Sequence, residues 1–158
     1  MRKFFAAIAS AVFVVIAPGF VAGLAPWWIS RADAGQAPLG LQRAGLFLMG
    51  FGSAVLLDSV VRFVKGLGTP APVFPTRRLV VSGLYRYVRN PMYIAVISVI
   101  LGQSLVHASV RVLGYGLLIW LAFHLFVLLY EEPTLRATYG NEYEQFCANV
   151  PRWIPRLR

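Results

Sequence analysis

Four long apolar runs dominate the chain, at residues 4–25, 44–64, 91–107 and 112–130, and polar segments separate them. A helix of about 20 mainly apolar residues crosses a bilayer, so each run is a candidate span, the third being short. Because the backbone in lipid must hydrogen-bond to itself, helices are the expected form of all four runs. The pattern therefore predicts an all-α integral membrane protein with about four transmembrane helices.

The first run also has features of a signal peptide, because two cations precede it and "AGLA" resembles a cleavage site. Its apolar stretch nevertheless continues through Trp27 and Trp28, well beyond the roughly 7–15 residues of a signal core. We therefore expect a retained span that bends near Pro18 and has the two tryptophans at the far interface.

Charged residues are scarce and unevenly placed. Of the 158 residues 58% are hydrophobic and 13% are charged, and the formal net charge is +9; soluble domains have about 25% charged residues. Of the 15 lysines and arginines, only Arg31, Arg43 and Arg111 lie on one side of the predicted membrane, and all the others lie on the opposite side. The positive-inside rule then places both termini and the loop 65–90 in the cytoplasm. The cations lie at membrane ends, which favours topology and anionic lipid over nucleic acid as their role.

The segment after the fourth run predicts a surface helix. Pro133 is expected to break the fourth helix, and a second helix is expected from about 133 to 148. Its apolar residues recur at spacings of three and four, at Leu135, Tyr139, Tyr143, Phe146 and Val150. This spacing is typical of an amphipathic helix at the membrane interface. The whole chain, 1–158, is expected to form one membrane domain.

The stretch "GLYRYVRNPMYIAV", residues 83–96, puts polar groups directly before an apolar run. Asn90 followed by Pro91 predicts a helix start, with Asn capping the free amides and Pro at the first helical position. The unpaired amides and the nearby Arg89 attract an anion such as a carboxylate or phosphate, and Tyr93 adds a hydroxyl or a ring. The alternative is that the arginines set topology and the tyrosines anchor the interface.

A second polar cluster, in "HLFVLLYEEP", places Glu131 and Glu132 at the inner end of the fourth run. Two acids at a helix C-terminus oppose the helix dipole, at a cost of up to about 1 kcal/mol. We therefore expect them to bind an arginine of the 86–89 cluster, or the amino or hydroxyl groups of a ligand. His124 lies seven residues earlier, two turns along the same helix face, where an interhelical hydrogen bond is the alternative role.

Two further features favour structural roles. Asp58 and Arg62 are four residues apart, the spacing of an ion pair on one helix. Cys147 is the single cysteine, so it forms no internal disulfide and is expected to fill a small apolar space. The sequence has no metal-ligand cluster, phosphate loop or dinucleotide-binding fingerprint.

Together the segments resemble the C-terminal signature of the integral-membrane methyltransferases, which include isoprenylcysteine carboxyl methyltransferases and phospholipid N-methyltransferases. The matching elements are "GTPAP", "LVVSGLYRYVRNPMY", "YEEPTLRATYGNEYEQF" and "VPRWIP", in the family's order over about residues 68–155. Asn90 stands where the isoprenylcysteine enzymes carry His, a difference that concerns the acceptor more than the methyl transfer.

The resemblance implies S-adenosylmethionine as cofactor, bound by the C-terminal half, 68–158. Arg89 and the helix start would take its carboxylate, and a glutamate its ammonium or ribose. The implied catalytic residues are Arg89, Glu131 and Glu132. The implied cofactor-binding residues are Tyr85, Arg89, Asn90, Pro91, Tyr93, His124, Glu131, Glu132, Tyr139 and Tyr143. The acceptor would be lipophilic or amphiphilic, with an isoprenylcysteine-like carboxylate or a phospholipid-like amine.

Two other classes of function compete with this one. A small proton-coupled transporter would use Asp58 as its site within the membrane, but it assigns no purpose to the two polar clusters. A lipid-binding membrane protein without catalysis needs no polar constellation. The short chain and the lack of eukaryotic sorting signals predict a bacterial inner membrane as the location.

Overall fold

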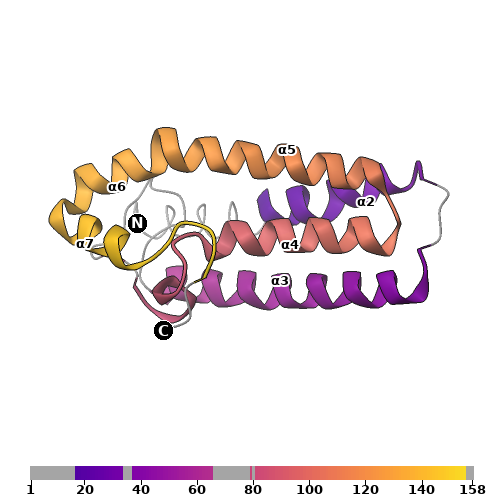
Figure 1. The fold of residues 1–158 in the computed structure, drawn as a ribbon, viewed down its shortest axis with the longest axis horizontal. Coiled ribbons are helices and arrows are strands. Elements are labelled where there is room, and N and C mark those ends of the chain that lie inside the picture. Colours follow the sequence, from indigo (N-terminus) through magenta and orange to yellow (C-terminus); the bar gives the residue numbers. More distant parts are fainter. Residues whose placement is uncertain (1–16, 34–36, 66–78, 80, 156–158) are drawn as a thin grey trace, which may run out of the picture.

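The computed structural model describes residues 17–33, 37–65, 79 and 81–155, which form helices joined by short turns (Figure 1). Three long helices, α3 (Leu39–Lys65), α4 (Pro91–Val106) and α5 (Val110–Phe126), run along the long axis of the molecule. α4 lies between the other two, and the short α2 (Ala25–Ser30) packs against α4 and α5. The described part of the chain has no strand, so the predicted all-α class is confirmed there.

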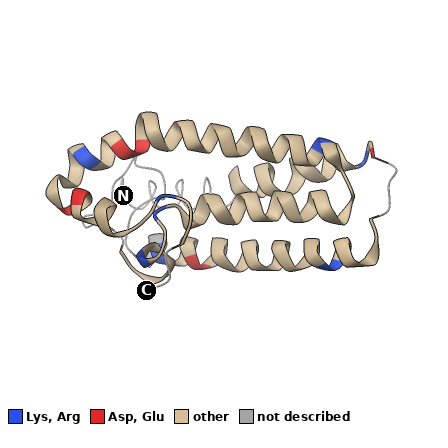
Figure 2. Cartoon of the chain, viewed as in Figure 1, with Lys and Arg blue, Asp and Glu red and all other residues tan. Residues whose placement is uncertain are grey.

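Two helices are long and apolar enough to cross a membrane, at Leu39–Arg62 and Val110–Tyr139. Only 22% and 17% of their apolar windows are buried, so most of these side chains face outward, unlike those of a soluble core helix. Figure 2 shows the charged residues near the two ends of the bundle, with an uncharged middle. α4, with 16 residues, is shorter, and residues 4–16 lie outside the described residues, so the count of four spans remains a prediction.

Small residues bring α3 and α4 into close contact. A Cβ atom on Gly45 would lie 2.5 Å from the Gly102 carbonyl oxygen, and one on Gly102 would lie 2.6 Å from the Gly45 oxygen. Further along, a Cβ on Gly52 would lie 2.6 Å from the Ala95 oxygen. Helices in membranes associate through such small residues, because lipid removes the hydrophobic drive that operates in water. The α3 and α4 backbones therefore approach each other closely along these glycines.

The first apolar run is helical over its described part and extends beyond the predicted end at residue 25, to Ser30. A π-helical segment, Gly19–Leu24, leads directly into α2. Pro26 has no N–H to donate to a carbonyl oxygen of the preceding turn. Carbonyl oxygens of that turn can therefore accept hydrogen bonds from side chains of other helices. The Tyr115 hydroxyl donates to the Val21 oxygen at 2.9 Å, and the Gln103 amide donates to the Ala22 oxygen.

The fourth helix continues through Pro133, so the predicted break at this residue is wrong. A π-helical segment, Val127–Glu131, joins α5 to α6 (Glu132–Tyr139). The Glu132 N–H bonds to the Val127 oxygen five residues back, and this wide turn accommodates a residue that lacks an N–H. Such π-turns inside α-helices are frequent at functional sites, and this one ends at Glu131, with Glu132 directly after it.

The chain reverses at Gly140, whose φ of 53° is a conformation that favours glycine. α7 (Asn141–Asn149) follows, so the single helix predicted from 133 to 148 is divided in two. The apolar Tyr143 and Val150 are buried within the protein, whereas Glu142 and Glu144 are exposed. The predicted amphipathic pattern is therefore used at least partly for internal packing, and the interfacial location of this segment remains a prediction.

Candidate functional site

The start of α4 is the first part of the candidate site. Pro91 is the first helical residue, as predicted, and Asn90 is the N-cap residue. The predicted capping bond is absent, because the Asn90 side chain makes no bond to the first-turn amides. Its Nδ2 instead donates to the Arg152 carbonyl oxygen at 3.1 Å. The first-turn amides of α4 thus have no side-chain cap, which keeps the positive end of this helix available to an anion.

A short helical turn before α4, Gly83–Arg86, is fixed to the end of α3. Arg62 donates to Asp58 at 2.7 and 2.8 Å and to the Ser82 hydroxyl at 3.3 Å. Gly83 has a φ of 59°, and a Cβ there would lie 2.2 Å from the Arg62 guanidinium carbon. The predicted pairing of Asp58 with Arg62 is confirmed, and Arg62 also contacts the residue before this turn.

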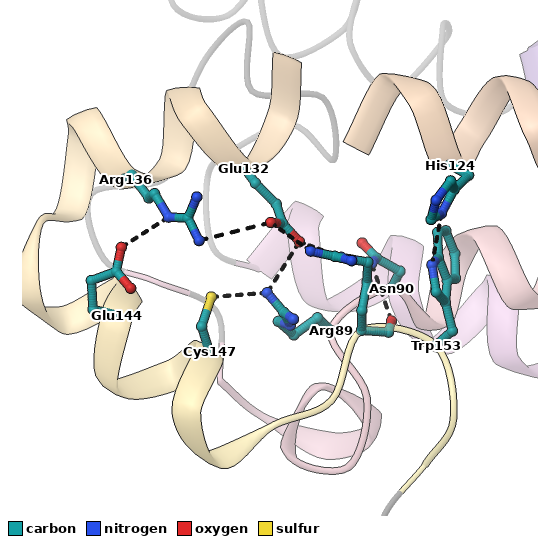
Figure 3. A network of polar contacts seen from close by, with 9 residues as sticks. Arg89, Asn90, His124, Glu132, Arg136, Glu144, Cys147 and Trp153 are labelled. Carbon is teal, nitrogen blue, oxygen red and sulfur yellow. Dashed lines mark hydrogen bonds and ion pairs between the residues drawn. The ribbon is translucent and has the colours of Figure 1, made fainter. Parts of the chain in front are cut away.

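Glu132 is the centre of a cationic cluster (Figure 3). It is 4% exposed. Arg152 binds it through both carboxylate oxygens, at 2.6 and 3.0 Å, and Arg89 Nη1 donates to Oε1 at 3.1 Å. Arg136 lies 4.0 Å away and also pairs with Glu144 at 2.8 Å. The predicted pairing of the second cluster with an arginine of the first is therefore present, between Arg89 and Glu132.

Arg89 is held on several sides. Its backbone N–H donates to the Pro151 oxygen at 2.9 Å, and Nη1 also donates to the Cys147 sulfur at 2.9 Å. Cys147 is thus a hydrogen-bond partner as well as a small packing residue. The Arg89 Nε is buried and has no hydrogen-bond partner in the described structure. A buried donor of this kind costs about 1–3 kcal/mol if it stays unpaired, so the site offers a position for an acceptor.

Tyr143 of α7 completes the Glu132 cluster. The phenol is 3% exposed. Burial raises the pKa of Tyr143, and the neighbouring Cys147 and Glu132 act in the same direction. Tyr143 therefore remains a neutral hydroxyl next to the charged groups. The carboxylate of Glu132 likewise raises the pKa of Arg152, whose guanidinium stays charged.

Glu131 has different surroundings from its neighbour. The Tyr93 hydroxyl donates to Glu131 Oε2 at 2.8 Å, and the Tyr93 ring lies 4.6 Å from that of Phe123. Tyr85 is 8% exposed; burial raises its pKa, and the charge of Glu131 adds to this effect. Among the described residues Glu131 forms no ion pair. Three of the sequence-predicted residues, Tyr85, Tyr93 and Glu131, are thus brought together as an acid surrounded by aromatic rings.

His124 makes a contact that the sequence did not predict. Its Nδ1 accepts a hydrogen bond of 3.1 Å from Trp153 Nε1, and its ring stacks on Trp120. The expectation that His124 and Glu131 share a helix face assumed a regular α-helix. The π-turn between them inserts one residue and so rotates Glu131 by about 100° relative to that expectation. Tyr139 is half-buried at the end of α6.

The residues that sequence reasoning missed come mainly from the C-terminal segment. Arg152 and Trp153 lie in the "VPRWIP" element, which the sequence analysis used only as a family marker. Arg136, four residues after Glu132, has the spacing of a helical ion pair and was detectable by that rule. No such spacing links Arg152 to Glu132, so only the tertiary structure reveals this contact.

Comparison with known proteins identifies the family. The model of the phospholipid methyltransferase family matches residues 41–142. The chain belongs to this family. The protein-S-isoprenylcysteine O-methyltransferase of Schizosaccharomyces pombe is 37% identical over 80 residues, which are 50% of this chain. The matched region is 34% of that relative's length. The resemblance that the motifs predicted is confirmed, and the family match covers both glutamates but ends before Arg152.

Proposed function

We propose that this chain is an S-adenosylmethionine-dependent methyltransferase that works in the membrane on a lipophilic or amphiphilic acceptor. Membership in the phospholipid methyltransferase family and the outward-facing apolar helices support this function. The observation that carries it is the meeting of the uncapped α4 start and Arg89 with two glutamates at the junction of the π-turn and α6. The proposal includes a single domain, 1–158, whose half from 68 to 158 binds the cofactor.

The residues of the site fit the polar groups of this cofactor. The unpaired Arg89 Nε and the uncapped amides of α4 suit a carboxylate. Glu131, which lacks an ion pair among the described residues, suits an ammonium or the ribose hydroxyls. Tyr85 and Tyr93 supply rings beside this acid, while Tyr139 and Tyr143 are the candidates for the other side of the site. These are the roles we assign to the cofactor-binding residues, together with Asn90, Pro91 and His124.

When bound, S-adenosylmethionine would supply a methyl group on its sulfonium, whose carbon bonds to the acceptor nucleophile in line as the carbon–sulfur bond breaks and S-adenosylhomocysteine leaves. The protein mainly has to align the acceptor and exclude water, and the half-buried position of Glu131 suits both tasks. A carboxylate acceptor needs no base, whereas an amine must first lose a proton. Glu131 is placed to take such a proton, with Tyr93 holding its carboxylate through a hydrogen bond. An apolar acceptor reaches the site from the bilayer.

We place this site on the cytoplasmic side of a bacterial inner membrane, with both termini in the cytoplasm. Calorimetric titration of the detergent-purified protein with S-adenosylmethionine tests the proposed function. Saturable binding that S-adenosylhomocysteine competes for is the expected result. The absence of binding, together with proton-coupled flux in vesicles that Asp58→Asn abolishes, would favour a transporter instead. The bidentate contact of Asp58 with Arg62 leaves that reading without structural support.

A further inference from the structure

The chain after α7 crosses the candidate site as an ordered segment, Val150–Pro155, which we call the C-terminal strap. Its Pro151 oxygen accepts from the Arg89 backbone, and its Arg152 oxygen accepts from Asn90 Nδ2. The Arg152 side chain binds Glu132, and Trp153 Nε1 donates to His124. Figure 3 shows the contacts of Glu132 and Asn90 and, beside them, the bond between Trp153 and His124. The strap thus joins the two halves of the site.

The two adjacent glutamates differ in how fully their oxygens are used. Glu132 Oε1 accepts from Arg89 and Arg152, and Oε2 accepts from Arg152 and lies 4.0 Å from Arg136. A carboxylate has about four acceptor positions, so hydrogen bonds from Arg89 and Arg152 already occupy most of those of Glu132. Glu131 accepts one hydrogen bond from Tyr93, and in the described structure it has no cationic partner. Glu131 therefore has more acceptor positions left for a ligand than Glu132 has.

The shape of the Arg152 contact is that of a structural clamp. Its Nε donates to Oε1 and its Nη2 donates to Oε2 of one carboxylate, the planar fork that fixes orientation as well as distance. This clamp sets the position of the strap, and the strap in turn receives the backbone N–H of Arg89. Arg89 is also bonded to Glu132 directly. The position of Arg89 at the helix start therefore depends on Glu132 and Arg152 in two ways, through its backbone bond to the strap and through its side-chain bond to Glu132.

We propose that Glu132 and Arg152 are positioning residues that hold the C-terminal strap and Arg89 in place, and that ligand contact falls to Glu131. This inference rests on the proposed function and divides the work between two acids that the sequence leaves equivalent. It also assigns a role to Arg152, which lies outside the segment that matches the family model.

A double-mutant cycle tests this division of roles. The variants are Glu131→Gln, Glu132→Gln and Arg152→Gln, with each glutamate change also combined with Arg152→Gln. The readout is the dissociation constant of S-adenosylhomocysteine, measured by calorimetry. Arg152→Gln alone is expected to weaken binding about tenfold. In the Glu132→Gln background it should add less than about twofold, because the clamp is already lost. In the Glu131→Gln background it should retain its full effect of about tenfold.

Hydrogen exchange of the Arg89 amide, which donates to the strap at the Pro151 oxygen, gives a second readout that does not depend on the ligand. Glu132→Gln and Arg152→Gln should both accelerate exchange of this amide, while Glu131→Gln leaves it unchanged. Arg152→Lys, which keeps the charge but lacks the bidentate fork, should give intermediate exchange and intermediate affinity. Thermal unfolding of each variant verifies that the protein is folded.

The proposal is overturned if Arg152→Gln reduces affinity equally in both glutamate backgrounds, or if exchange of the Arg89 amide is the same in the parent, Glu132→Gln and Arg152→Gln. It is also overturned if Glu131→Gln binds like the parent while Glu132→Gln does not. A parent protein that binds no cofactor would instead refute the proposed function, and the exchange measurement would still test the clamp.

Discussion

Replacing Arg89 with methionine removes a charge from the candidate site while keeping a side chain of similar length. Arg89 is a partner of Glu132 and has a buried Nε without an acceptor. Glu132 retains its bidentate contact with Arg152 in the variant, so the loss of Arg89 does not leave a buried acid unpaired. We therefore expect Arg89→Met to fold.

The Arg89→Met substitution should weaken ligand binding rather than folding. A hydrogen bond to a charged group contributes about 1.5–3 kcal/mol, and each 1.4 kcal/mol is about tenfold in affinity. Loss of the contact between Arg89 and the cofactor carboxylate is therefore expected to weaken S-adenosylhomocysteine binding by about tenfold to a hundredfold. Calorimetric titration measures this change directly.

A matched control is available at the opposite end of the bundle. Arg111 pairs with Asp33 at 3.5 Å, and its side chain is 62% exposed. Arg111→Met should leave cofactor affinity within about twofold, because exposed ion pairs contribute at most about 1 kcal/mol to stability. A folded Arg89→Met protein that binds the cofactor as tightly as the parent would refute the assignment of Arg89.

Three further predictions concern packing, Asp58 and topology. Gly102→Leu should destabilise the protein by about 1–3 kcal/mol, because its Cβ meets the Gly45 oxygen, whereas Gly114→Leu has open space around it and should be tolerated; thermal unfolding in detergent compares the two. Asp58→Asn should leave cofactor affinity within about twofold of the parent, since Asp58 pairs with Arg62 away from Glu132; a severe loss would place Asp58 in the site. A reporter fused after residue 158 should lie in the cytoplasm and one inserted near residue 35 outside it, and the reverse result would invert the orientation.

Much of the fold follows from local rules. The length and composition of the apolar runs predict the helices, and Asn90-Pro91 predicts the first residue of α4. Negative charges at a helix C-terminus are unfavourable, which predicts that the two glutamates have partners. Arg89 is such a partner, for Glu132. Each of these inferences uses residues within one helix or at its ends, where sequence spacing determines geometry.

The errors arise where the helix departs from regular geometry or where contacts are distant in sequence. The rule that Pro breaks a helix assumes α-helical hydrogen bonding, and the π-turn before Pro133 removes that assumption. The same turn changes the face on which Glu131 lies relative to His124. Asn90 binds the strap rather than its own helix because Arg152 approaches from 62 positions along the chain. Spacing rules contain no information on such a contact.

The most direct test of the central claim is to locate the bound cofactor on the chain. Ultraviolet cross-linking of radiolabelled S-adenosylmethionine to the detergent-purified protein, followed by peptide mapping, identifies the residues that it contacts. We predict labelled peptides from the α4 start, residues 83–93, or from the π-turn and the residue after it, residues 127–132, with protection by excess S-adenosylhomocysteine. Protectable label confined to the opposite end of the bundle, around residues 105–111, would contradict the account.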